Sequence, residues 1–182
     1  MSKMKRLADH YETHIGIPWR DAAAAQRVIF CVYHESDELK LRAKIGEFEL
    51  ATQRKSHRWL HFDITDTFPE WLSKQKYATS YYQNPPLLSS LMPKYGEYLC
   101  QCIVEFVEKN KADDNTVVAL SGVASLFGLV KVKDVVEKVA TKVAGRLLVF
   151  FPGRYEHNNF RLLDGYDGWD YHAFVITADK EL

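Results

Sequence analysis

The sequence predicts a single three-layer α/β domain built on a mostly parallel sheet of about five strands. Two observations carry this prediction: short apolar runs rich in β-branched and aromatic residues recur along the chain, and helical patterns lie between them. With 182 residues, of which 47% are hydrophobic, the chain is long enough for one sizeable core. We therefore expect residues 1–182 to form one domain, with residues 1–25 as an N-terminal helical extension.

Five apolar runs predict the strands. Most of them are continuous instead of alternating, which is typical of strands that are covered on both faces. The expected strands are Arg27–Tyr33, Trp59–Ile64, Thr116–Leu120, Leu147–Phe151 and Ala173–Ile176.

Helical spacing of apolar residues fills the intervals between these strands. Before the first strand, Asp21–Gln26 resembles the tail of an N-terminal helix, and after Ser36 a helix should run as far as Gln53, with Gly46 as a potential break. The other expected helices are one capped by Asp66 or Thr67 that ends at Pro85-Pro86 with Trp71, Leu72, Ala78 and Tyr82 facing inward, one over Lys94–Lys109, and one over Val130–Val143.

The charge balance and the cysteine count restrict the class of protein. The 24 Lys and Arg residues equal the 24 Asp and Glu residues, so no overall positive field attracts nucleic acid, and direct nucleic-acid binding is not expected. The charged N-terminus lacks the apolar core of a signal peptide, and no stretch is apolar enough to span a membrane. Three sparse cysteines indicate a reducing compartment, and we expect a cytoplasmic protein without membrane association.

The expected carboxyl ends of the strands are where an α/β enzyme would carry its chemistry. No GxxxxGKS or GxxxxGKT loop follows the first strand, and Ser121 lacks the GxSxG pattern of a nucleophile elbow. We therefore assign no catalytic residue, no cofactor and no enzymatic activity. The alternative is an enzyme that depends on a metal or a nucleic acid: His34, Glu35 and Asp63, together with His61, would suit a divalent ion if the first two strands were neighbours.

The segment between the last two strands has the most distinctive composition. Pro152 and Gly153 should turn the chain sharply out of its strand into a long ordered loop that is rich in aromatic, Asn and Asp residues. Its arginines would either pair with Asp164, Asp167 and Asp170, which would lock the loop, or bind a partner, and both roles stay open. The candidate interaction or loop-locking residues are Pro152, Gly153, Arg154, Tyr155, Asn159, Arg161, Asp164, Asp167 and Trp169.

The stretch FFPGRYEHNNFRLLDGYDGWDYHAFVI resembles the BrxB family of the BREX bacteriophage-exclusion systems, and the resemblance extends to Glu38–Thr52, Asp63–Tyr82 and LSGVASLFGLVKVKDVVEKV. It implies a phage-defence role as a non-enzymatic assembly factor or adaptor, with the phosphatase-like BREX protein PglZ and the BREX ATPase as candidate partners. It also implies a fold similar to a phosphate-loop ATPase core without the phosphate loop. The resemblance gives the motif residues no chemical role.

Overall fold

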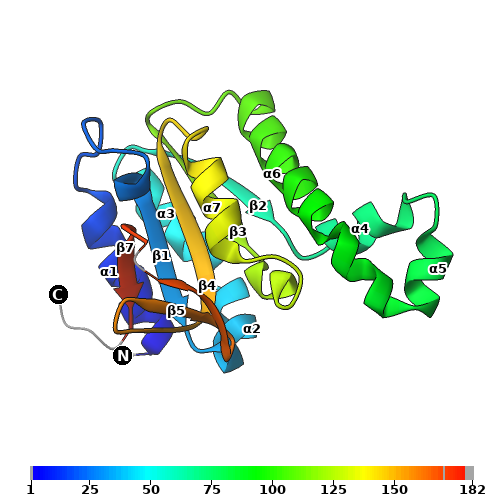
Figure 1. Cartoon of the computed structure of the whole chain (residues 1–182). Helices are drawn as coiled ribbons and strands as arrows, with labels where there is room; N and C mark the ends of the chain where they lie inside the picture. Colours follow the sequence, from blue (N-terminus) through cyan, green and yellow to red (C-terminus); the bar gives the residue numbers. More distant parts are fainter. Residues whose placement is uncertain (1, 170, 179–182) are drawn as a thin grey trace.

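The computed structural model describes residues 2–169 and 171–178, and it confirms the three-layer α/β architecture (Figure 1). Five strands pair in parallel in the order β2-β3-β4-β1-β7, so each predicted strand is present. Their bounds are β1 (Val28–Tyr33), β2 (Arg58–Asp63), β3 (Thr116–Ser121), β4 (Arg146–Glu156) and β7 (Phe174–Thr177). The strands β1 and β3 are buried at every residue, whereas β2 lies at an edge and is only partly covered.

Two hydrophobic cores, one on each face of the sheet, hold the layers together. On one face lie α1 (Lys3–Ile15), α2 (Glu38–Arg42) and α3 (Ile45–Arg54), and on the other lie α6 (Met92–Lys109) and α7 (Val132–Ala140). The segment expected as an N-terminal extension contains α1, whose Leu7, Tyr11 and Ile15 side chains are fully buried in the first of these cores. Within the described residues, no helix combines the length and the apolar character needed to cross a membrane.

Two helix boundaries differ from the sequence prediction. The helical tail predicted at Asp21–Gln26 is wrong, because α1 ends at Ile15 and only the 3-10 turn η1 (Ala25–Arg27) precedes β1. After β1, the 3-10 turn η2 (Glu35–Asp37) leads into α2, and the break between α2 and α3 falls at residues 43–44, before Gly46. This early break lets α3 change direction and bury Phe48 against the sheet.

The helix predicted between Asp66 and Pro85 is divided into α4 (Thr67–Ser73) and α5 (Ala78–Gln83), followed by the 3-10 helix η3 (Pro85–Leu91). These elements project from the body of the molecule at the right of Figure 1. Trp71 and Leu72 are buried as predicted, but Tyr82 is 57% exposed and does not face inward. The apolar pattern therefore predicted helix but not burial.

The long loop predicted after Phe151 is wrong. β4 continues through Pro152 and Gly153 as far as Glu156, and β5 (Asn159–Leu162) and β6 (Gly165–Trp169) fold back as an antiparallel extension of the sheet. At Pro152 the partners of β4 change from the parallel strands to β5. The absence of an N–H group in proline therefore removes few hydrogen bonds between strands. The Pro152 carbonyl accepts a hydrogen bond from Leu163 N at 2.9 Å.

A buried arginine that has no carboxylate partner among the described residues joins α1 to the start of β4. Arg146 Nη1 donates to His14 Nε2 at 2.6 Å, Arg146 Nη2 donates to Ile17 O at 3.1 Å, and the guanidinium lies 4.8 Å from the Trp19 ring centroid. His14 also stacks on Phe174 with ring centroids 3.5 Å apart. Burial, and then the charge of Arg146, lower the pKa of His14 to about 4.

This pair predicts an acid-sensitive attachment of α1. The unfolded chain binds a proton at His14 near pH 6.5 and the folded chain only near pH 4, so stability is present above pH 6.5 and is lost as the pH falls towards 4. Between pH 7.5 and 5, His14 should remove about 2 kcal/mol from the free energy of unfolding. Urea denaturation at both pH values measures this loss. The His14→Gln variant retains an acceptor but does not titrate, and an equal loss in that variant would contradict the prediction.

Candidate functional site

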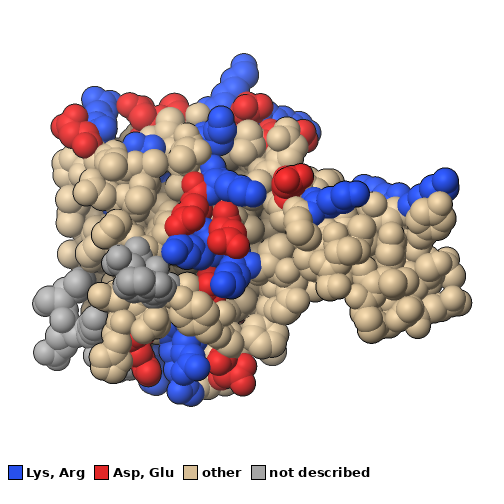
Figure 2. Space-filling model, in the orientation of Figure 1, with Lys and Arg blue, Asp and Glu red and all other residues tan. Residues whose placement is uncertain are grey.

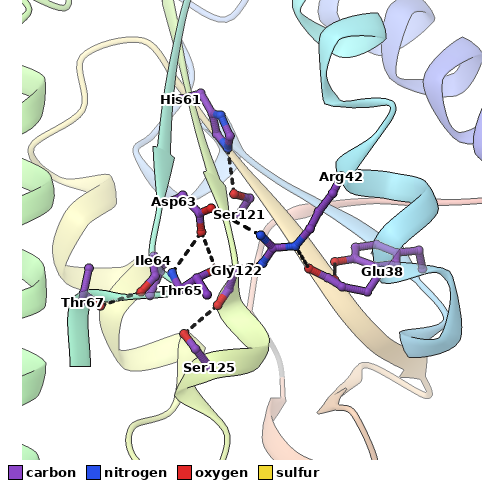
Figure 3. Close-up of polar contacts among 11 residues, drawn as sticks. Glu38, Arg42, His61, Asp63, Ile64, Thr65, Thr67, Ser121, Gly122 and Ser125 are labelled. Carbon is purple, nitrogen blue, oxygen red and sulfur yellow. Dashed lines mark hydrogen bonds and ion pairs between the residues drawn. The ribbon is translucent and has the colours of Figure 1, made fainter. Parts of the chain in front are cut away.

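A polar cluster lies at the carboxyl edge of β2 and β3, where Asp63 and Ser121 stand opposite each other in the parallel register (Figure 3). Asp63 Oδ1 accepts from Thr65 N at 3.0 Å and from Thr65 Oγ1 at 2.6 Å. Arg42 reaches over from α2, placing Nη1 3.4 Å from Asp63 Oδ2 and donating through Nη2 to Thr65 Oγ1 at 2.8 Å. The carboxylate is thus held by its own loop and by a neighbouring helix.

The electrostatics of this cluster favour its charged form. Partial burial by itself raises the pKa of Asp63, but the two hydrogen bonds from Thr65 and the charge of Arg42 outweigh burial and leave that pKa below its ordinary value. The hydrogen bond from Arg42 Nε to Glu38 Oε1, at 2.8 Å, raises the pKa of the guanidinium. At neutral pH the Asp63 carboxylate and the Arg42 guanidinium are therefore both charged.

Ser121 and His61 form a second contact in the same cluster. His61 Nε2 lies 2.7 Å from Ser121 Oγ, and desolvation lowers the pKa of the imidazole. Gly122 follows with φ +72°, and a Cβ there would lie 2.3 Å from Thr65 Oγ1 and 2.5 Å from Asp63 Oδ1. Glycine is thus required for β3 to end so close to the Asp63 loop.

The contact between the serine and the histidine lacks two features of a catalytic pair. A base needs a third group to orient it, yet within the described residues His61 hydrogen-bonds only to Ser121. Ser121 is 3% exposed, so its hydroxyl is covered by the surrounding chain. The cluster instead joins the ends of two strands to α2.

The alternative prediction of a metal site at His34, Glu35 and Asp63 is wrong, because it required the first two strands to be neighbours and they are not. The strands β3 and β4 lie between β1 and β2. His34 Nε2 instead lies 3.6 Å from Glu35 Oε1, while Asp63 is engaged by Thr65 and Arg42. Among residues 2–169 and 171–178, no group of three or more His, Cys, Asp or Glu side chains is arranged to hold a metal ion.

The C-terminal motif places its two arginines on the outer side of the β4–β5 hairpin. Arg154 and Arg161 are direct cross-strand partners and both are exposed, and Tyr166 on β6 stands opposite Arg161. Neither arginine forms an ion pair with another described residue, so pairing with Asp164 or Asp167, one of the two roles left open by the sequence, is not seen. Asp170, the third aspartate of that alternative, lies outside the described residues. We call Arg154, Arg161 and Tyr166 the arginine patch.

Other residues of the motif shape this hairpin. Gly153 allows close strand pairing, because a Cβ there would lie 1.9 Å from the Arg161 carbonyl oxygen. The tight turn between β4 and β5 uses His157 and Asn158 at positive φ, and it is fixed by Tyr155 Oη donating to Asn158 Oδ1 at 2.9 Å and Asn159 Nδ2 donating to His157 O at 3.1 Å.

The aspartates of the motif are used differently from one another. Asp167 is buried beside the bulge in β6 and accepts from the backbone N–H groups of Val132 at 2.7 Å and Lys133 at 2.9 Å, so it caps α7 from a distant part of the chain. Burial raises the pKa of Asp167, although these two backbone hydrogen bonds oppose the shift. Asp164 is exposed. The side chain of Trp169 and all of Asp170 lie outside what the structure describes.

The family model described as BREX protein BrxB matches residues 63–176, which is more than half of the chain. The chain belongs to the BrxB family. It is therefore a component of a BREX phage-defence system. No curated protein and no solved structure matches it, and the likeness to a phosphate-loop ATPase core stays a prediction.

The matched range of this BrxB-family chain extends from the end of β2 to β7 and includes α4, α5 and the C-terminal motif. Glu38–Thr52, which also carried the resemblance, lies outside that range. The sequence reasoning missed Arg42 and Thr65 as partners of Asp63, and it missed His61 as the partner of Ser121. An Asp-x-Thr pattern directly after a strand, as in Asp63-Ile64-Thr65, was the only local signal for this cluster.

The cap on α7 predicts a stability effect within the motif. Asp167→Ala should lower the free energy of unfolding by about 1–2 kcal/mol, because two N–H groups at the helix terminus lose their acceptor. Asp164→Ala, an exposed aspartate on the same hairpin, is the matched control and should change stability by less than about 0.5 kcal/mol. Urea denaturation of both variants provides the comparison, and equal effects would show that the cap contributes nothing.

Proposed function

We propose that this BrxB-family chain is a non-enzymatic assembly or adaptor component of its BREX system that bridges PglZ and the BREX ATPase. The observation that carries the proposal is a contrast between two surfaces. At the carboxyl ends of β2 and β3, which we call the closed edge, the polar side chains bond to one another, whereas the arginine patch is exposed. The two arginines of the patch face solvent without a charged partner among the described residues.

The closed edge supports the absence of an enzymatic role. In an α/β enzyme the carboxyl ends of the strands hold the substrate. Here Asp63 is engaged by Thr65 and Arg42, and Ser121 is covered and bonded to His61. The position after β1, where a phosphate loop would begin, carries His34 and the short 3-10 turn η2 in place of glycines and lysine.

The arginine patch supports docking. Like charges directly opposite each other on adjacent strands are unfavourable, so Arg154 and Arg161 raise the free energy of the isolated hairpin. Two carboxylates from a partner would relieve this repulsion and accept bidentate hydrogen bonds. Tyr166, which is 53% exposed next to Arg161, adds an aromatic surface of the kind enriched at protein interfaces. We assign PglZ to this patch.

Charge reversal of the patch tests the docking role. In co-purification and titration with PglZ, the variant Arg154→Glu with Arg161→Glu should bind at least about tenfold more weakly, and its melting temperature should stay within a few degrees of the parent. The variant Lys109→Glu with Lys142→Glu reverses two exposed charges elsewhere and should bind normally. Unchanged PglZ binding by the patch variant would remove PglZ from this surface. Absence of PglZ binding by the parent chain would overturn the adaptor proposal.

Substitutions in the closed edge test the absence of chemistry. Ser121→Ala and His61→Ala should each leave protection against phage within about twofold of the parent, because neither side chain faces a substrate in the proposed role. Plaque counts on cells with the complete BREX system measure this, with immunoblots to confirm equal protein levels. A loss of protection by a folded Ser121→Ala protein would indicate a catalytic role for the pair.

A further inference from the structure

The projecting elements form a surface that lacks a core of its own. In residues 73–94, which we call the arm, no side chain is buried, although the segment is rich in Tyr, Leu and Pro. Tyr77 and Tyr82 are each 57% exposed and Leu87 is 45% exposed. Neither α5 nor η3 contributes a buried residue. Tyr81, Leu88 and Leu91 pack partly against the core, whereas Tyr77, Tyr82 and Leu87 stay exposed to water.

The base of the arm is nevertheless rigid. Phe68, Trp71 and Tyr95 pack against one another with ring centroids 5.0 to 6.2 Å apart, and Tyr98 lies 6.3 Å from Trp71. Thr67 Oγ1 lies 2.8 Å from Tyr95 Oη, which ties α4 to α6. Because this aromatic base belongs to the core of one face of the sheet, the arm is held in a fixed direction. A surface fixed in advance loses less entropy when it binds.

The charge of the arm has a single sign. Between Glu70 and Glu97 the sequence contains Lys74, Lys76 and Lys94 but no Asp or Glu, although the whole chain is neutral. Figure 2 shows the projecting part at the right as mostly uncharged surface edged by Lys and Arg, without acidic side chains on its outer part. The complementary surface is therefore apolar and is flanked by carboxylates.

We infer that the arm is a docking element that inserts Tyr77, Tyr82 and Leu87 into an apolar groove, bordered by Asp and Glu side chains, on a second protein of the BREX complex. This inference rests on the proposed adaptor function in one respect: the partner is assumed to be another protein of the BREX complex. It gives the chain a second surface, on a different element from the arginine patch, as a bridging protein requires.

The same features disfavour other occupants. The affinity of a protein for a nucleic-acid backbone rises with the number of phosphates that its Lys and Arg side chains neutralise. The arm has only three lysines, so its affinity for nucleic acid should be low. Arm-to-arm pairing of two copies would bring like charges together. A protein groove uses both the aromatic and the aliphatic side chains, and Tyr is among the residues that contribute most at protein interfaces.

Site-specific cross-linking tests the inference on the full chain. Benzoylphenylalanine in place of Tyr82, in cells that carry the complete BREX system, should give a photo-adduct with one other BREX protein. The peptide identified by mass spectrometry should contain apolar residues close to Asp or Glu. The matched control is the same substitution at Leu50, which is 54% exposed on α3 and belongs to the opposite face of the sheet. Adduct yield no higher than at Leu50, or adducts with a second copy, nucleic acid or lipid, would overturn the inference.

Variants of the arm give an independent measurement with the partner so identified. Tyr77→Ser with Tyr82→Ser, and separately Lys74→Glu with Lys76→Glu, should each weaken binding at least about tenfold, and the melting temperature should stay within a few degrees because none of these residues is buried. Both variants should retain PglZ if PglZ binds the arginine patch. The effect of the patch variant on PglZ binding tests only the proposed function. If both arm variants bind the cross-linked partner as tightly as the parent does, the docking role of the arm is refuted.

Discussion

The pairing of β4 with three other strands is the constraint on which the rest of the structure depends. Its first half lies between β1 and β3 in parallel ladders and is buried throughout, and its second half leaves those partners and pairs antiparallel with β5. One strand therefore connects the hydrophobic core to the C-terminal hairpin, and the hairpin inherits its position from the core. Gly153 permits this continuation, since any Cβ there would collide with the β5 backbone. Asp167 then fastens the far strand of the hairpin to α7.

In this arrangement, the polar groups that bond to one another lie apart from the side chains that are exposed without a partner among the described residues. At the carboxyl edge, Asp63 and Ser121 find partners within the chain, and Arg42 connects them to α2. On the hairpin, two arginines face each other and solvent. On the arm, Tyr77, Tyr82 and Leu87 are exposed beyond the aromatic base. Polar groups that hydrogen-bond to one another stabilise a fold. Binding a partner lowers the free energy of repelling charges and of exposed aromatic side chains, so the arginine patch and the arm both support an adaptor role.

The sequence predicted the five parallel strands because continuous runs such as Val28–Tyr33 are buried on both faces in any such sheet. It failed at Pro152-Gly153, where turn-forming residues lie inside a strand, because the change of pairing partner that makes proline acceptable there is a long-range property. It failed at Tyr82 for a related reason: helical spacing predicts an apolar face but not whether anything covers it. The metal alternative failed because strand order is not written in any local pattern.

The sequence by itself determined the α/β class, the positions of the strands and the membership in the BrxB family, because hydrophobic periodicity and the C-terminal motif are local properties of the chain. Only the tertiary structure decided which polar residues meet. His61 joins Ser121 because β2 and β3 are neighbours, and Asp167 caps α7 because a bulge in β6 directs it there. Only the tertiary structure, too, left the arginine patch and the arm uncovered, since exposure depends on every element that could pack against a side chain and on none of them alone.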